Sequence, residues 1–243
     1  MASVAIGYHG LIRGFRFPEV RKTHEDLLIN ELKSQGYEVD VYVHTFDKDY
    51  DESIKLVNPK KLVIDNDLET ENYVKQYMKP YIFPHYFSKD QRTNYFKDML
   101  TRKKVFEMIT AENKSYTWVL MINPGNLIIG AIDDLRPLDA TKLYIPDFSH
   151  HGGYNGRCAI GSMDTMRIYS SVFDRIVKYQ NPPFYLSNPK QDIFDAKGRV
   201  TLHPESSIKI HLNMSGIYPL EQGYLLRSFV FERLRTDGTR VGN

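Results

Sequence analysis

The sequence feature that most constrains the fold is the apolar segment 116–122, which runs directly into Asn123-Pro124-Gly125-Asn126. A run of this length that ends at an Asn-Pro-Gly turn predicts a strand buried on both faces of a sheet. In open α/β sheets, ligands bind outside the carboxyl ends of such strands. We therefore expect one rim of an active site at residues 123–126. A second rim is expected at 147–157, the loop that follows the apolar residues 143–146.

The chain is long enough to bury a complete core. Its 243 residues are 42% hydrophobic, which predicts one domain. We expect residues 1–115 to form a nucleotide-binding half, residues 116–235 to form a donor- and acceptor-site half, and residues 236–243 to be a frayed tail. The balance of 32 basic and 30 acidic residues gives a net charge of +2, which supports no nucleic-acid or membrane-surface role.

The cellular setting is predicted from what the sequence lacks. Cys158 is the only cysteine, so the chain cannot form an intramolecular disulfide. The first residues show no charged region followed by a long apolar one, so we expect no signal peptide. No apolar run approaches the ~18 residues that span a bilayer. We therefore expect a soluble cytoplasmic protein without a membrane span.

The first third of the chain predicts a parallel strand-helix-strand unit, with strands at 4–8 and 39–45 and a helix at 23–34. Thr23 and Asp26 form a plausible capping pair, and Gly36 ends the helix. The loop after the first strand contains Gly10 and Arg13, a candidate phosphate site whose alternative is a solvated turn.

A third strand is predicted at 61–65, followed by an Asp-x-Asp element at Asp65 and Asp67. Two such carboxylates can hold a divalent cation against a diphosphate, although acidic pairs at strand ends are also common in solvated turns. Asp65 could instead bind a ribose or a base edge. Thr45, at the end of the second strand, is a further candidate for cofactor binding.

Helices are predicted at 90–113 and 164–179 from their apolar spacing. Prolines interrupt regular structure in residues 69–87, which form either a lid or a packed surface excursion. Arg102 lies mid-helix in the run Arg102-Lys103-Lys104, and a basic residue that faces the cleft could neutralise a leaving diphosphate. For at least two of the three, a solvated polar face is the better interpretation. A short strand is predicted at 199–202, and a last strand or helix within 224–234.

The block 143–169 resembles a family of small GT-A-type glycosyltransferase-like proteins, found in surface-polysaccharide gene clusters and in large algal DNA viruses. The resemblance is densest in Gly152-Gly153-Tyr154-Asn155-Gly156-Arg157-Cys158-Ala159-Ile160-Gly161-Ser162. The first loop and the second strand are also typical of that family. Two of its aspartates are replaced here, by Gly125 and Gly156. The resemblance implies an α/β fold, a GT-A-like α/β/α sandwich with a mostly parallel (mixed) central sheet and a Rossmann-like N-terminal half.

The same resemblance suggests roles for site residues. Asn155 and Arg157 are favoured for substrate contact, although Arg157 could equally brace the loop. Glu205 follows His203-Pro204. Its functional interpretation is a substrate-binding carboxylate or a general base, and its structural interpretation is a carboxylate that stabilises the positive end of a helix. Asn123 and Asp147 belong to the two expected rims. Asn123 and Asn155 are candidates for cofactor binding, and Asp147 is a candidate catalytic residue together with Arg157 and Glu205. His150 and His151 are better placed to hydrogen-bond a sugar hydroxyl or the backbone than to bind a metal.

The leading functional prediction is a glycosyltransferase that uses a nucleotide sugar, such as a UDP- or GDP-sugar, to extend an oligosaccharide or glycoprotein acceptor. With Gly125 in place of the usual metal ligand, Mn²⁺ or Mg²⁺ would have to be held by Asp65, Asp67, Asp147 or His211. Otherwise Arg13 and Arg102 hold the diphosphate without a metal, or the protein is inactive. The alternatives are a catalytically silent binder of a glycan or nucleotide sugar, and an unrelated nucleotide-dependent α/β enzyme.

Overall fold

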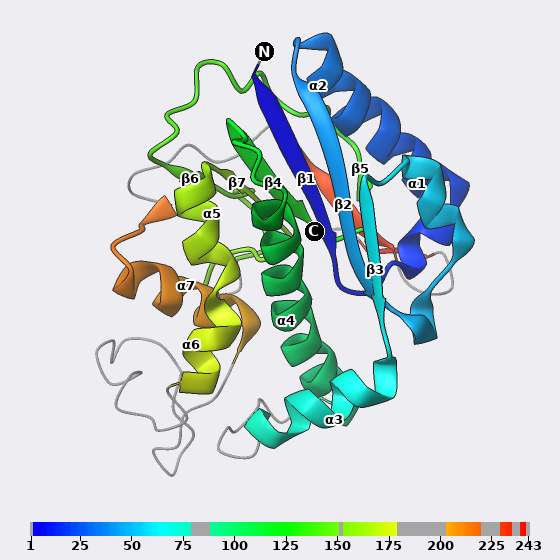
Figure 1. Ribbon diagram of the computed structural model, residues 1–243, viewed down its shortest axis with the longest axis vertical. Helices are drawn as coiled ribbons and strands as arrows, with labels where there is room; N and C mark the ends of the chain where they lie inside the picture. Colours follow the sequence, from blue (N-terminus) through cyan, green and yellow to red (C-terminus); the bar gives the residue numbers. More distant parts are fainter. Residues whose placement is uncertain are drawn as a thin grey trace.

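The computed structural model describes residues 2–78, 88–150, 153–178, 203–219, 229–234 and 239–241. Within these residues the centre of the protein is a six-stranded sheet in the order β3-β2-β1-β4-β7-β6 (Figure 1). Its strands are β1 (Ser3–His9), β2 (Glu38–Phe46), β3 (Lys61–Asp65), β4 (Trp118–Ile122), β6 (Leu143–Tyr144) and β7 (Cys158–Gly161). A smaller antiparallel sheet has the order β5-β8-β9 and contains β5 (Asn126–Ile128), β8 (Phe231–Leu234) and β9 (Arg240–Val241).

The central sheet is mixed but mostly parallel. β1 runs parallel to both β2 and β4, and β2 runs parallel to β3, whereas β7 is antiparallel to β4 and to β6. The parallel order 3-2-1-4 is that of a Rossmann-like half. The predicted α/β class, the mixed and mostly parallel sheet and the Rossmann-like N-terminal half are therefore confirmed.

Helices cover both faces of this sheet (Figure 1). One face carries a helical segment made of α1 (Pro18–His24), the π-helical η2 (Glu25–Asn30) and α2 (Glu31–Ser34). The opposite face carries α4 (Lys89–Ala111), with α3 (Asp67–Met78), α5 (Met163–Ser170), α6 (Val172–Lys178) and α7 (Pro204–Met214) around it. Three short 3₁₀ helices, η1 (Arg13–Arg16), η3 (Asp47–Asp49) and η4 (Glu52–Val57), follow β1 and β2.

The two helical layers explain why β1 is buried at every position. Alternate side chains of a strand point to opposite faces of the sheet. Ile6 belongs to the core cluster that contains Leu28 and Leu32 of the first helical segment, whereas Ala5 packs in the cluster that contains Val105 and Ile109 of α4. A strand covered on both faces needs no polar side, as the unbroken apolar run indicates.

Several element boundaries differ from those predicted. The first helix begins at Pro18 rather than Thr23, because a proline suits the first turn, where its missing N–H costs nothing. Thr23 caps nothing; its Oγ1 donates to the Val20 carbonyl at 2.9 Å inside the helix. Gly36 does end the segment, with φ +89°.

Two further predictions of secondary structure need correction. Part of the stretch expected to be irregular forms α3, which occupies residues 67–78; residues 79–87 lie outside the described ranges. The helix predicted at 164–179 is divided at Ser171 into α5 and α6. The strand predicted at 199–202 also lies outside the described ranges. Arg240 and Val241, in the expected tail, pair with β8.

Candidate functional site

The strand order changes direction between β1 and β4. From β1 the chain proceeds through β2 to β3 on one side, and it returns to β4 on the other side. A crevice forms at the carboxyl ends of parallel strands where the order reverses in this way. The cavity found there has a volume of about 610 Å³, within the usual range for small-molecule sites.

The cavity collects residues from six parts of the chain. It is lined by Gly10, Leu11, Arg13, Phe46, Gln91, Asn94, Tyr95, Lys97, Asp98, Arg102, Asn123, Gly125, Asn126, Gly156, Arg157, His203, Pro204, Glu205 and Ile208. Six of the ten predicted site residues are among them: Gly10, Arg13, Arg102, Asn123, Arg157 and Glu205. The other four, which are Thr45, Asp65, Asp147 and Asn155, do not line it.

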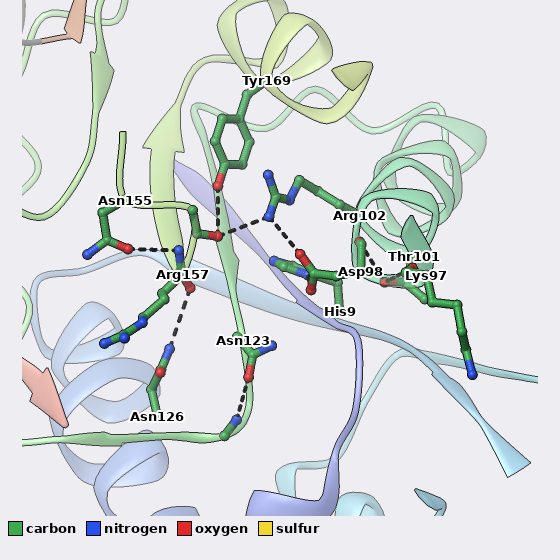
Figure 2. Close-up of polar contacts among 12 residues, drawn as sticks. His9, Lys97, Asp98, Thr101, Arg102, Asn123, Asn126, Asn155, Arg157 and Tyr169 are labelled. Atoms are coloured by element: carbon green, nitrogen blue, oxygen red, sulfur yellow. Dashed lines mark hydrogen bonds and ion pairs between the residues drawn. The ribbon is translucent and has the colours of Figure 1, made fainter. Parts of the chain in front are cut away.

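Arg102 is the most deeply buried charge at the cavity, with 2% of its surface exposed. Its Nη2 donates to Asp98 Oδ2 at 2.9 Å and to the Gly156 carbonyl at 3.0 Å, and its guanidinium lies 4.7 Å from the centre of the Tyr169 ring (Figure 2). Nε and Nη1 have no hydrogen-bond partner among the described residues. A buried guanidinium with N–H groups left over is suited to an anionic ligand.

Asp98 and His9 form a pair at this site that sequence reasoning missed. His9 is fully buried at the end of β1, and its Nδ1 lies 3.0 Å from Asp98 Oδ1. Burial lowers the pKa of His9 despite the nearby carboxylate. Burial favours a higher pKa for Asp98, but His9 and Arg102 hold it below the ordinary value. The spacing of Asp98 and Arg102, four residues apart on one helix, was the available sequence signal.

The glycine after β1 is required by its position. Gly10 has φ +85°, and a Cβ added there would lie 2.9 Å from Asp98 Oδ1 and 3.3 Å from Asn123 Nδ2. Only glycine combines this backbone conformation with so close an approach. Gly10 thus brings the ends of β1, α4 and β4 together.

The turn after β4 is held by side chains on both of its sides. Asn123 Oδ1 accepts from the Gly125 N–H at 2.8 Å (Figure 2). The Asn123 N–H donates to the Arg157 carbonyl at 2.9 Å. Behind the turn, His24 Nε2 lies 2.7 Å from the Asn126 carbonyl and Nδ1 lies 3.0 Å from the Tyr8 hydroxyl. Burial lowers the pKa of His24 to about 4, so the imidazole is neutral and can donate on one side and accept on the other.

Asn155 acts within its loop. It is 1% exposed, its Nδ2 donates to the Phe148 carbonyl at 2.8 Å, and its Oδ1 accepts from the Arg157 N–H at 2.9 Å. This arrangement places Arg157, rather than Asn155, at the cavity (Figure 2). The described contacts of Asn155 shape the loop, and its contact with a substrate stays a prediction.

The loop that carries Asn155 docks on the start of α7. A Cβ at Gly153 would lie 1.9 Å from the backbone carbon of Glu205, and the Tyr154 N–H donates to the Glu205 carbonyl at 3.0 Å. The Glu205 side chain lines the cavity and is 21% exposed, with Oε2 2.9 Å from His203 Nδ1. Both interpretations of Glu205, as a helix-start residue and as a cavity carboxylate, fit this position.

Thr45, Asp65 and Asp147 lie outside the cavity for different reasons. Thr45 is fully buried. Asp65 is held in an ion pair with Lys104, and its Oδ2 lies 3.2 Å from His44 Nε2. Asp147 is exposed on the surface of its loop.

The divalent-cation candidates do not assemble into a metal site. Among the described residues no group of three or more His, Cys, Asp or Glu side chains could hold a metal ion. Asp67 is paired with Lys97, as Asp65 is with Lys104. His211 is buried, with Nε2 2.5 Å from the Ile168 carbonyl. The described side chains thus do not fit the Mn²⁺ or Mg²⁺ considered from the sequence.

The charge of the cavity lining favours an anion. Its basic side chains are Arg13, Lys97, Arg102 and Arg157, whereas its carboxylates are Asp98 and Glu205. Lys97 is neutralised by Asp67, and Arg102 is partly neutralised by Asp98. Arg13 makes no hydrogen bond or ion pair with the described residues. Positive charge is therefore left over, as a phosphate-binding site requires.

The sequence matches no protein-family profile, and no curated protein sequence is significantly similar to it. None of the described helices combines the length and the apolar character needed to cross a membrane. Among solved structures, the apo form of mouse xyloside xylosyltransferase 1 is similar, with a TM-score of 0.44 and 9% identity over 88% of this chain and 82% of that chain. The fold assignment rests on the strand order, and the resemblance to the viral and polysaccharide-cluster family stays a prediction.

Proposed function

We propose that the protein transfers a sugar from a nucleotide-sugar donor to a hydroxyl group of a glycan acceptor. The observation that carries this proposal is the cavity at the β1/β4 switch point, where Arg102 has N–H groups without a partner among the described residues and Arg13 and Glu205 line the same cavity. The switch point of a Rossmann-like sheet binds the pyrophosphate group of dinucleotides, and a nucleotide sugar carries the same group. The acceptor would be an oligosaccharide or a glycoprotein glycan.

The reaction assigns a task to each charged group. The acceptor hydroxyl gives its proton to Glu205 while its oxygen forms a bond to the anomeric carbon of the donor sugar. The bond from that carbon to the diphosphate oxygen breaks, and the diphosphate leaves with the electron pair. Arg13, Arg102 and Arg157 stabilise the charge that develops on the diphosphate. The proposal uses no metal step, because the described residues offer no matching set of ligands.

The first experiment is thermal-shift binding against a panel of UDP- and GDP-sugars, each with and without Mn²⁺ or Mg²⁺. A ligand that binds the native state raises its unfolding free energy by RT ln(1 + [L]/Kd). We expect one donor to stabilise the protein selectively, with little dependence on the cation. A flat response to every donor would contradict the proposal.

Two variants connect that response to the cavity. Arg13→Gln is expected to remove most of the stabilisation by the donor, since it deletes the unpaired cation. Arg16→Gln is the matched control, because Arg16 is exposed on the same short helix and does not line the cavity. Equal losses in both variants would show that the donor does not bind at this cavity.

Gly125→Asp tests the position where the resembling family carries an aspartate. A Cβ at Gly125 would meet only Asn123 Oδ1, at 3.0 Å, so the substitution requires a small shift. If the loop can become a metal site, the variant gains binding or activity that depends on Mn²⁺. No gain would mean that this loop is not the site of the family's metal.

A catalytically silent binder of the same ligands is the second candidate. It is favoured by Gly125 and Gly156, which replace two aspartates of the family pattern. Product formation separates the two candidates: donor binding without transfer to any glycan acceptor would support the silent binder.

A further inference from the structure

The strand β3 is an outer edge of the central sheet. Within the described part of the chain it pairs with β2 alone, and it lies at one side of the sheet in Figure 1. Ile64 of β3 is 40% exposed, and Leu56 and Leu68, in the elements that precede and follow β3 in the sequence, are 68% and 66% exposed. An exposed apolar edge strand is a template for pairing with another chain.

The backbone of β3 shows which of its groups remain available. The Lys60 N–H donates to the Val41 carbonyl of β2. Because alternate residues of a strand direct their N–H and C=O groups to opposite sides, Leu62 and Ile64 also bond toward β2. Lys61, Val63 and Asp65 therefore direct their N–H and C=O groups away from the sheet.

The sequence of β3 is complementary to itself when it is reversed. It reads Lys61-Leu62-Val63-Ile64-Asp65. In an antiparallel pair of two identical strands centred on Val63, each Lys61 faces an Asp65 and each Leu62 faces an Ile64. Opposite charges and apolar pairs across strands stabilise such a ladder.

The charged side chains are available for this pairing. Lys61 makes no hydrogen bond or ion pair with the described residues. Asp65 is bound to Lys104, but 22% of its side chain is exposed, so its carboxylate can accept a second cation.

We infer that β3 pairs with β3 of a second copy of this chain, antiparallel and with a two-fold axis at Val63. The two central sheets then become one continuous sheet, and the interface is isologous. The outward N–H and C=O groups of Lys61, Val63 and Asp65 bond across the axis. This inference is independent of the proposed function, because no residue of β3 lines the cavity.

The association is tested by sedimentation equilibrium of the full chain from micromolar to millimolar concentration. We expect a dimer that Lys61→Glu weakens about tenfold or more, since two attractive pairs become repulsive. Lys33→Glu is the matched control, an exposed lysine on α2 with the same change of charge. A monomeric wild-type protein, or equal weakening by both variants, would overturn the inference.

Cysteine cross-linking tests the register. In a hydrogen-bonded antiparallel pair the Cα atoms are ~5.5 Å apart, within the range of a disulfide. Val63→Cys is expected to form a covalent dimer under mild oxidation, because each residue 63 faces its own copy. Ile64→Cys faces Leu62 and is expected to cross-link much less. Native Cys158 is fully buried and does not interfere. Equal cross-linking at both positions would refute the two-fold axis at Val63.

Discussion

Arg102 combines a structural and a ligand-binding role in one side chain. It bridges Asp98 and the Gly156 carbonyl and covers the Tyr169 ring. Lysine keeps the charge but cannot make the two planar hydrogen bonds and the ring contact together. We expect Arg102→Lys to lower the unfolding free energy by about 1–3 kcal/mol and to abolish donor binding.

Urea denaturation and thermal-shift binding measure the two effects of Arg102→Lys separately. Lys103→Arg is the control on the neighbouring residue, which is 30% exposed and pairs with Asp174. Its unfolding free energy should change by no more than about 0.5 kcal/mol. An Arg102→Lys protein that binds donor normally would show that the free N–H groups of Arg102 are not used.

At the residue scale the sequence identified the positions on loops better than those on helices. Gly10, Arg13 and Asn123 follow strands, and the rule that ligands bind at strand ends is sufficient to find them. Asp98 and His9 were missed because they are 89 residues apart and nothing local indicates that they meet. Asn155 was assigned to substrate because of its motif, whereas its hydrogen bonds hold Arg157 in place.

At the scale of elements, the docking of the 153–157 loop on α7 depends on the absence of a side chain at Gly153. A Cβ there would overlap the Glu205 backbone, which cannot move without shifting α7. We expect Gly153→Ala to lower the unfolding free energy by more than about 2 kcal/mol. Gly125→Ala is the control, since its Cβ would have a single close neighbour. Similar melting temperatures for the two variants would contradict this account of the loop.

The start of α4 offers a milder test at the same scale. Ser88 Oγ accepts from the Gln91 N–H at 3.2 Å, and Gln91 Oε1 accepts from the Ser88 N–H at 2.8 Å. This capping box gives acceptors to two backbone N–H groups that have no partner within the helix itself. Ser88→Ala should cost about 1 kcal/mol of unfolding free energy, whereas the exposed Ser34→Ala should cost little. Urea titration measures the unfolding free energy of both variants. An unchanged value for Ser88→Ala would mean that the capping box does not stabilise α4.

The elements themselves were largely predictable, because strands covered on both faces read as unbroken apolar runs. The errors fall where local signals compete. Pro18 was a stronger helix start than Thr23, and α3 formed although its apolar spacing is weak. The division at Ser171 could not be foreseen, because the amphipathic pattern continues across it.

At the scale of the whole molecule, buried histidines make stability depend on pH. Burial lowers the pKa of His24, His44 and His211 to about 4 from the ordinary 6.5. The unfolded chain therefore binds more protons than the native state below pH 6.5. The contribution of these neutral histidines to the unfolding free energy is fully present above pH 6.5 and is lost progressively as the pH falls towards 4.

Unfolding free energy measured by urea titration across this pH range tests the expectation. One fully buried imidazole contributes up to about 3 kcal/mol at the acidic end. His24→Gln should be less stable at neutral pH, since two hydrogen bonds change, but its stability should fall less steeply with acid. The same slope in the variant and the wild-type protein would mean that His24 does not titrate in this range.

The π-helical turn η2 has a consequence for how the chain tolerates changes in length. A π-helix holds one residue more per turn than an α-helix, and in an α-helix one residue corresponds to a rotation of ~100°. Here the wide turn separates His24, which faces the Asn126 carbonyl, from Leu32, which faces the sheet. Deletion of one residue between positions 25 and 30 would therefore convert the wide turn into ordinary α-helix and leave its two ends close to their present phase. The imidazole would then keep its place behind the turn after β4, whereas the same deletion within the regular helix α4 would rotate one of its ends by about 100°.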